Sequence, residues 1–184
     1  MDNGAGSYRR FLDGDENGFV EIVRDYKDGL ILYLNSFVDN FSAAEELTED
    51  TFVKLGIKKP HFSENSSFRT WLYAVGRNTA IDYLRKQSKR DTVPIDECAK
   101  IADIELLEST YLQEERKIII HKAIMKLKAE YRQVLWLIYF EGFSVKEAAK
   151  IMKKSPHNIE TLTYRAKQSL KSELIREGFN YEDI

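Results

Sequence analysis

Hydrophobic residues recur at every third or fourth position along most of this chain. The first such series runs from Phe19 to Val38, the second from Leu47 to Leu55 and the third from Phe68 to Tyr83. This spacing gathers apolar side chains on one face of an α-helix. No stretch alternates apolar and polar residues between turn signals, as a β-strand would. The pattern therefore predicts an all-α protein.

Capping residues predict where several of these helices begin and end. Ser42 and Glu45 have the spacing of a capping box, which predicts a helix that begins there and ends near Gly56. The segment 57–67 has turn composition and predicts a loop. A long helix follows it and is expected to end near Lys89.

A change of composition divides the chain into two units. Residues 91–111 are acidic, contain Pro94 and show only weak periodicity, so we expect a flexible linker. On either side we predict two small helical domains, covering residues 8–90 and 112–177. Residues 1–7 contain two glycines and little to bury, so we expect them to be disordered.

Composition narrows the class of protein. The 184 residues are 43% hydrophobic and include nine Gly and three Pro, which excludes wholesale disorder and collagen-like repeats. The single Cys98 excludes a disulfide framework and a cysteine-based zinc site. The longest apolar runs are far shorter than the roughly 20 residues of a membrane span, and no signal sequence opens the chain. We expect a cytoplasmic protein with no membrane insertion.

The net charge of −2 hides an uneven distribution. Residues 68–90 and residues 146–171 each carry a net charge of +5, while residues 91–117 between them carry −5. Two separated basic blocks indicate two contacts with an anionic partner, or else two helix faces that are simply solvated. Charge alone does not choose between these interpretations.

Residues 144–170 have the pattern of a helix-turn-helix. Ser144 and Glu147 form a capping box, and a short helix leads to a turn at Lys153. Ser155 is a favourable N-cap, and Pro156 takes the first helical position, where its missing N–H costs nothing. The apolar face of the second helix comprises Ile159, Leu162, Thr163, Ala166 and Leu170.

The opposite face of that second helix is polar. Its members are His157, Thr161, Tyr164, Arg165 and Gln168, flanked by Asn158 and Glu160. Polar residues near a helix N-terminus can reach base edges in the major groove, while basic ones hold phosphates. The pattern favours DNA binding, although an ordinary helical hairpin with a solvated face would look similar.

The helix expected over residues 68–89 combines aromatic, amide and guanidinium groups. One flank carries Trp71, Asn78, Asp82 and Arg85, with Arg77 among the further basic residues around it. Such a mixture suits unstacked bases. The alternative interpretation makes Trp71 a core residue and leaves the charges in solvent.

Three stretches together resemble one protein family. They are AEELTEDTFVKL (44–55), FRTWLYAVGRNTAIDYLRK (68–86) and YRQVLWLIYFEGFSVKEAAKIMKKSPHNIETLTYRAKQSLK (131–171). In this order and spacing they resemble regions 2.2, 2.3–2.4 and 4 of bacterial RNA polymerase sigma factors, in the extracytoplasmic-function (ECF) group of the sigma-70 family. The resemblance implies a region 2 helical bundle and a region 4 helix-turn-helix, which bind core polymerase and direct promoter-specific initiation.

The resemblance also implies three sets of site residues. Those that dock on the clamp helices of the polymerase's largest subunit are Glu45, Glu46, Leu47, Glu49, Asp50 and Phe52. Those that melt and read the −10 element are Asn65, Ser66, Ser67, Trp71, Arg77, Asn78, Asp82 and Arg85. Those that contact the −35 element are Lys154, His157, Asn158, Thr161, Arg165 and Lys167. The family further implies promoter DNA and an anti-sigma factor as partners.

The chain departs from the family pattern at a few positions. The family often has Gln at the position of Glu49, Trp at Gly56, Gly at Lys153 and basic residues at Glu160 and Leu162. Glu160 could accept a hydrogen bond from a cytosine amino group, or it could weaken phosphate contacts. No particular −35 sequence is carried over from the family.

Two other function classes compete with this interpretation. One is a stand-alone regulator that binds DNA through residues 144–171 without polymerase. The other is a helical hydrolase, but the sequence has no Glu-x-x-His pair and no phosphate-binding glycine loop, and its three histidines are scattered. We therefore expect no catalytic residue, no metal and no cofactor.

Overall fold

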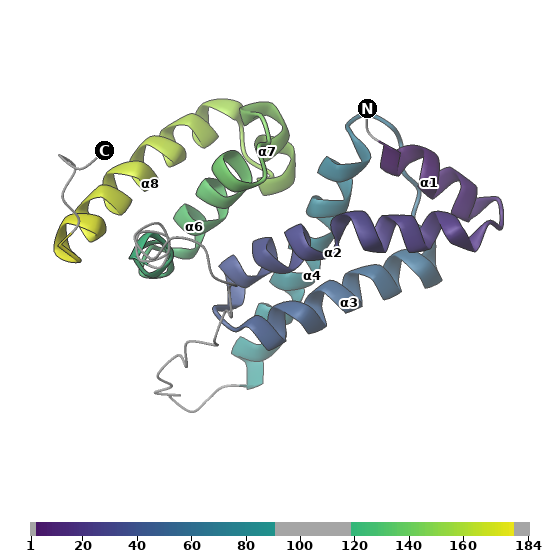
Figure 1. Cartoon of the computed structure of the whole chain (residues 1–184), viewed down its shortest axis with the longest axis horizontal. Helices are drawn as coiled ribbons and strands as arrows, with labels where there is room; N and C mark the ends of the chain where they lie inside the picture. Colours follow the sequence, from purple (N-terminus) through teal and green to yellow (C-terminus); the bar gives the residue numbers. More distant parts are fainter. Residues whose placement is uncertain (1–2, 91–118, 179–184) are drawn as a thin grey trace, which may run out of the picture.

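The computed structural model describes residues 3–90 and 119–178, and within these ranges it contains helices and connecting turns but no strand (Figure 1). The first domain comprises α1 (Asn3–Leu12), α2 (Glu16–Val38), α3 (Phe41–Lys58) and α4 (Phe68–Arg90). In the second, a helical segment at 119–125 precedes α6 (Ala129–Leu135), the π-helix η1 (Trp136–Phe140), α7 (Val145–Met152) and α8 (Pro156–Arg176). The all-α prediction is confirmed, while the predicted linker lies outside the described residues.

Helix α2 is the centre of the first domain and packs against α1, α3 and α4. Its residues Leu30, Tyr33 and Leu34 are completely buried. Gly76 lets α4 approach α2 closely, because a Cβ atom there would lie 2.9 Å from a methyl carbon of Leu30. This packing holds α4 in a fixed orientation for whatever its outer face binds.

The N-terminal segment is ordered, so the prediction of disorder over residues 1–7 is wrong for its described part. Residues 3–7 belong to α1, and Tyr8 in the same helix is only 1% exposed. A Cβ atom on Gly4 would collide with Phe68 and with the hydroxyl of Tyr26. The glycine therefore serves close packing, and its partners lie too far along the sequence for a local pattern to reveal them.

The predicted start of α3 is also wrong. Its N-cap is Asn40, whose side chain accepts a hydrogen bond from the Ala43 backbone N–H at 3.0 Å, rather than Ser42 paired with Glu45. Asn caps helices as well as Ser does. Asp39, in the left-handed conformation, ends α2 directly before it, so the turn between the helices leaves Asn40 as the extended capping residue. The helix ends at Lys58, two residues beyond Gly56.

The predicted helix-turn-helix in the second domain is confirmed. Both hydrogen bonds of the Ser144–Glu147 capping box are present at the start of α7. The Ser155 side chain caps α8 by accepting from the Asn158 backbone N–H at 3.2 Å, and Pro156 occupies the first turn. Ile151, Ile159 and other apolar side chains of both helices are buried in a core shared with α6 and η1.

The two domains pack against each other. Helix α7 contacts α4, and α6 contacts α2. Figure 1 shows the second domain, in green and yellow, beside the purple and blue helices of the first. The contact brings the helix-turn-helix against the same helix that carries the predicted −10 residues.

Candidate nucleic-acid interface and partner surfaces

Helix α3 has a buried face and an exposed face, and they divide the predicted core-polymerase residues. Leu47 is 2% exposed and Phe52 is 6% exposed, so both side chains lie inside the first domain and offer little surface to a partner. Both belong to the core against α2 and α4. Of the others, Glu46, Glu49 and Asp50 are exposed and Glu45 is half-buried.

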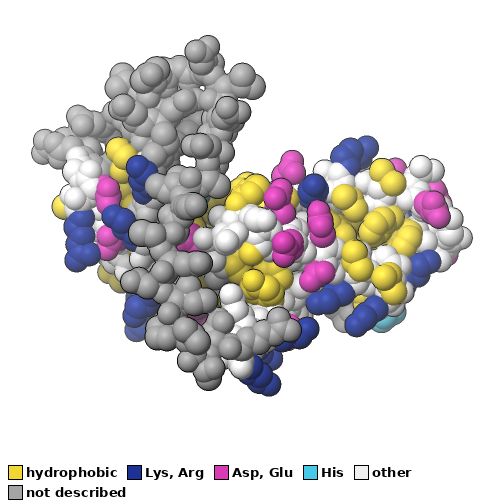
Figure 2. All heavy atoms as spheres, turned by 90° about the horizontal axis from the view of Figure 1, so that it is seen from below, with side chains coloured by type: hydrophobic (Ala, Val, Ile, Leu, Met, Phe, Trp, Pro, Cys, Tyr) yellow, Lys and Arg dark blue, Asp and Glu magenta, His cyan; other side chains and the backbone are white. Residues whose placement is uncertain are grey.

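The exposed face of α3 carries two apolar residues that the sequence analysis missed. Val53 is 53% exposed and Ile57 is 77% exposed. At 100° per residue they fall within about 100° of arc with Glu46, Glu49 and Asp50. We name these five residues the α3 stripe; Figure 2 shows acidic side chains beside apolar ones on this side of the first domain. The sequence contained a signal for this exposed face, because the helical period places Val53 and Ile57 on the side opposite the buried residues of α3.

The loop at 59–67 positions the next predicted set. Asn65 is exposed, while Ser66 and Ser67 are half-buried. The Ser67 hydroxyl accepts from the Thr70 backbone N–H at 3.1 Å, so it caps the start of α4 and is already engaged. Asn65 donates from its side-chain amide to the Ser63 hydroxyl at 3.3 Å, a weak contact that a ligand can replace.

An aromatic cluster formed by α1, α4 and the loop itself packs beneath the loop 59–67. Trp71 is half-buried, with its ring centroid 5.4 Å from those of Tyr8 and Phe68 and 5.3 Å from that of Phe62. Part of the Trp71 side chain therefore packs in the core, as the alternative interpretation expected. The rest of the ring remains accessible to solvent.

Helix α1 holds the same loop from one side, which the sequence did not indicate. The Tyr8 hydroxyl donates to the Pro60 carbonyl at 2.7 Å, and Arg9 pairs with Glu64 at 2.9 Å. Burial raises the pKa of Tyr8 to about 12, so its hydroxyl keeps the proton that it donates. The loop is thus anchored at Pro60 and Glu64, on either side of Phe62.

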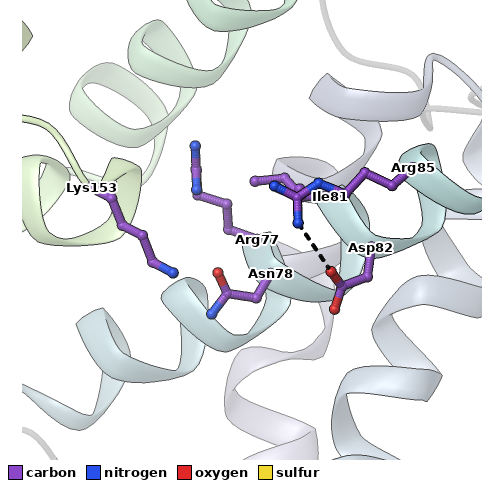
Figure 3. Close-up of a pocket in the computed structure, with 6 residues that line it drawn as sticks. All are labelled: Arg77, Asn78, Ile81, Asp82, Arg85 and Lys153. Atoms are coloured by element: carbon purple, nitrogen blue, oxygen red, sulfur yellow. Dashed lines mark ion pairs between the residues drawn. The ribbon is translucent and has the colours of Figure 1, made fainter.

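The remaining −10 residues surround a basic pocket of about 520 Å³ on α4, formed by Arg77, Asn78, Ile81, Asp82 and Arg85 together with Lys153 (Figure 3). Asp82 and Arg85 lie 3.9 Å apart, a weak exposed pair. The Nε atom of Arg77 is buried without a hydrogen-bond partner among the described residues. The pocket therefore offers cationic groups to an anion such as a phosphate.

Lys153 comes to this pocket from the second domain. It is the C-cap of α7, and in Figure 3 its side chain points toward Arg77 and Asn78. The sequence placed Lys153 only in the turn of the helix-turn-helix. Its position beside α4 depends on the packing between the domains.

The outer face of α8 presents most of the predicted −35 residues to solvent. His157, Asn158 and Arg165 are exposed, and Thr161 is half-buried. The two lysines assigned to phosphates have partners within the chain: Lys154 pairs with Glu130 at 3.0 Å, and Lys167 lies 4.8 Å from the centre of the Tyr139 ring. Both contacts are partly open to solvent, so a phosphate can compete for these lysines.

Comparison with known proteins supplies the family. The chain matches the family models "Sigma-70 region 2" over residues 22–90 and "Sigma-70, region 4" over residues 117–170. It is 32% identical over 162 residues to the ECF RNA polymerase sigma factor SigM of Bacillus subtilis (strain 168), covering 88% of this chain and 98% of that protein. The chain belongs to the ECF sigma factors. It directs RNA polymerase to promoters for transcription initiation, as its resemblance predicted, and the stand-alone regulator is not favoured.

Solved structures agree with this assignment. The sigma factor RpoE of Bartonella quintana, in complex with the anti-sigma factor NepR, matches with a TM-score of 0.68 and 27% identity, covering 85% of this sigma factor and 96% of that chain. CnrH, in complex with the cytosolic domain of CnrY, shares the fold with a TM-score of 0.67 at 21% identity over 96% of this chain and 99% of that one.

Two other kinds of site are absent from the described residues. No described helix has the length and apolar character needed to cross a bilayer. Within residues 3–90 and 119–178, no three His, Cys, Asp or Glu side chains gather closely enough to hold a metal ion.

Proposed function

We propose that this sigma factor divides promoter recognition between its two domains, with the first reading the melted −10 strand and the second reading duplex −35 DNA. The observation that carries the proposal is that each domain presents its own basic polar surface. One lies on α4 and the loop before it, and the other on the outer face of α8. Both domains act on DNA held by the polymerase in the cytoplasm, and the sigma factor supplies no chemical step.

The −10 surface suits single-stranded DNA. The exposed part of the Trp71 ring can stack on an unpaired base, and Asn65 and Ser66 can hydrogen-bond its edge. The pocket cations Arg77 and Arg85 would neutralise the phosphates of the same strand. Ser67 acts indirectly, by capping α4 beneath the loop.

The −35 surface suits the major groove of a duplex. His157 and Asn158 lie in the first turn of α8, and Thr161 and Arg165 follow in the next two turns of its N-terminal half. This is the end of a recognition helix that reaches base edges. Lys154 and Lys167 would exchange their internal partners for phosphates.

The α3 stripe is the proposed dock for the clamp helices of the polymerase's largest subunit. It combines three exposed carboxylates with the exposed side chains of Val53 and Ile57. An apolar contact with a charged rim is the usual composition of a protein interface. We also propose an anti-sigma factor as a regulatory partner, because the related RpoE was solved with one.

Transcription on two templates tests the division of labour. One template is fully duplex and the other is pre-melted across −10. The Trp71→Ala change should impair opening of the duplex and be rescued by the bubble, because its target exists only after unstacking. The Arg165→Ala change removes a duplex contact, so the bubble should not rescue it.

Two controls accompany this experiment. Thermal melting of Trp71→Ala measures the stability lost from the aromatic cluster, and Trp71→Phe retains a stacking ring. If Trp71→Ala and Arg165→Ala respond identically to the bubble, the two domains do not divide promoter recognition in this way.

A further inference from the structure

One carboxylate lies on the otherwise polar and basic outer side of α8. Between Pro156 and Ser172 the sequence has three basic residues and a single acidic one, Glu160. The Glu160 side chain is 64% exposed. The preceding residue, Ile159, is completely buried and fixes how the helix is rotated against its domain. Glu160 therefore points its charge toward solvent, not into the domain core.

Glu160 shares its side of the helix with residues proposed to read the −35 element. It lies in the second turn of α8, directly before Thr161. At 100° per residue it is about 60° around the helix from His157 and about 40° from Tyr164. The Tyr164 side chain is itself 65% exposed. A duplex that receives the N-terminal half of α8 in its major groove therefore meets Glu160 at one edge of the contact.

Within the part of the chain that the structure describes, this carboxylate is not neutralised by a close partner. Its ionic partner there is the Nδ1 atom of His157 at 4.0 Å, which is too long for a hydrogen bond. Residues three and four positions away could pair with it along the helix, but none is a lysine or an arginine. They are Pro156, His157, Thr163 and Tyr164.

The other acidic residue of α8 has a different environment. The Glu173 side chain is 20% exposed and pairs with Arg176 at 2.7 Å. It lies near the C-terminal end of the helix, away from the proposed −35 residues. Glu173 thus has a basic partner within its own helix, whereas the Glu160 oxygens are available to a donor outside the chain.

The chemistry of base edges limits what that donor can be. Phosphates repel a carboxylate, so Glu160 is favourable at the DNA only where a base gives it a hydrogen bond. In the major groove, guanine and thymine present acceptors at O6, N7 and O4, and adenine presents the N7 acceptor beside its amino group. Cytosine presents its N4 amino donor without an adjacent acceptor. Cytosine is therefore the base that suits a carboxylate.

We propose that Glu160 is a specificity-determining residue, which selects cytosine at one position of the −35 element by accepting a hydrogen bond from its N4 amino group. The inference rests on the proposed function of α8 and adds a base preference to it. Arg165, Lys154 and Lys167 supply the attraction to DNA that offsets the repulsion between Glu160 and the phosphates. A basic residue at position 160 would favour guanine, so this chain's departure from the family reverses the preferred base pair.

Selection from a promoter library tests this assignment. The library is duplex DNA with a constant −10 element and a randomised −35 element, and it is selected by the full-length chain together with core polymerase. Sequencing of the bound fraction gives the preference for each base at each position. For the unmodified chain we expect one −35 position at which cytosine exceeds the other bases by about tenfold.

Three substitutions of Glu160 should change the base at that one position. Glu160→Gln should shift the preference to adenine, because an amide can pair with both N6 and N7. Glu160→Arg should shift it to guanine, through O6 and N7. Glu160→Ala should leave the position without a preference. The side chain is exposed, so the melting temperature of each variant should stay close to that of the unmodified chain.

Glu173→Gln is the matched control. It removes the same charge from the same helix at a site away from the proposed −35 residues, so every base preference should stay as in the unmodified chain. The measurement also tests the competing explanation that Glu160 only weakens phosphate contacts. In that case Glu160→Gln and Glu160→Ala would bind all library sequences more tightly and would keep the same preferences, which would overturn the inference.

The failure of this inference differs from the failure of the proposed function. A clear −35 preference that is identical in the unmodified chain, Glu160→Gln and Glu160→Arg overturns the role of Glu160 and leaves −35 reading by the second domain intact. Failure of the proposed function appears instead as an unmodified holoenzyme that selects no −35 sequence at all, and the inference falls with it.

Discussion

At the scale of single residues, Lys153 occupies a conformation that glycine prefers. It ends α7 with φ of 54°, in the left-handed region. A residue with a Cβ atom pays roughly 1–2 kcal/mol for this conformation. The family's frequent glycine at this position has a physical reason, and this chain carries a lysine there in spite of the strain.

Replacing Lys153 with Gly should therefore stabilise the second domain by about 1 kcal/mol, less the backbone entropy that glycine loses on folding. Urea unfolding measures the change. Gly142 is the matched control, because its φ is 67° and a Cβ atom added there would have no neighbour within 4 Å. Gly142→Ala should destabilise by a similar amount, and a loss of stability in Lys153→Gly would contradict the argument.

Tyr8 positions the loop before α4, because its hydroxyl donates a hydrogen bond to the Pro60 carbonyl. Tyr8→Phe removes the 2.7 Å bond to the Pro60 carbonyl while the ring stays in the aromatic cluster. We expect a stability loss of about 1 kcal/mol and weaker discrimination among bases at −10, because the capture loop loses one anchor. Transcription from a set of −10 variants measures the discrimination.

The matched change Tyr131→Phe lies in the second domain and should leave −10 discrimination unaltered. Equal discrimination by Tyr8→Phe and the unmodified chain would show that the loop does not need this anchor.

At the scale of elements, α3 separates stability from partner binding on its two faces. Leu47 is buried, so Leu47→Ala should cost about 2–5 kcal/mol of folding free energy. Ile57 is exposed, so Ile57→Ser should change stability by less than about 0.5 kcal/mol and should instead weaken association with core polymerase. Thermal melting and competition for core polymerase measure the two effects.

A matched control for the stripe is Leu12→Ser, because Leu12 is an exposed apolar residue on α1, away from the exposed face of α3. It should compete normally for core polymerase. An Ile57→Ser protein that also competes normally would remove the α3 stripe from the docking surface.

At the scale of the whole molecule, the free sigma factor should bind duplex promoter DNA poorly. Its net charge is −2, and its basic residues are divided between two blocks, 68–90 and 146–171, on different domains. Affinity for DNA depends on how many phosphates are neutralised at once. Core polymerase should hold the two blocks apart in register and so produce specific binding.

Fluorescence anisotropy of labelled promoter DNA, with and without core polymerase at one salt concentration, measures this difference. A scrambled promoter of the same length controls for non-specific binding. Equal specific affinity in both cases would favour the stand-alone regulator instead.

The sequence by itself determined the features that depend on neighbours a few residues apart. The Ser144–Glu147 box, the Ser155 cap with Pro156, and the polar face of α8 were all predicted, because caps and helix faces obey local rules. Three motifs in series were also enough to indicate the family.

Only the tertiary structure decided the features whose partners are distant along the chain. Gly4 packs under Phe68, and Tyr8 holds Pro60, so α1 is ordered although its composition suggested otherwise. Arg69 meets Glu141 across 72 residues, and no local pattern predicts that pairing. Burial and docking depend on which group lies opposite a side chain in space. The helical period of a sequence tells which face a residue occupies, but it does not tell what packs against that face.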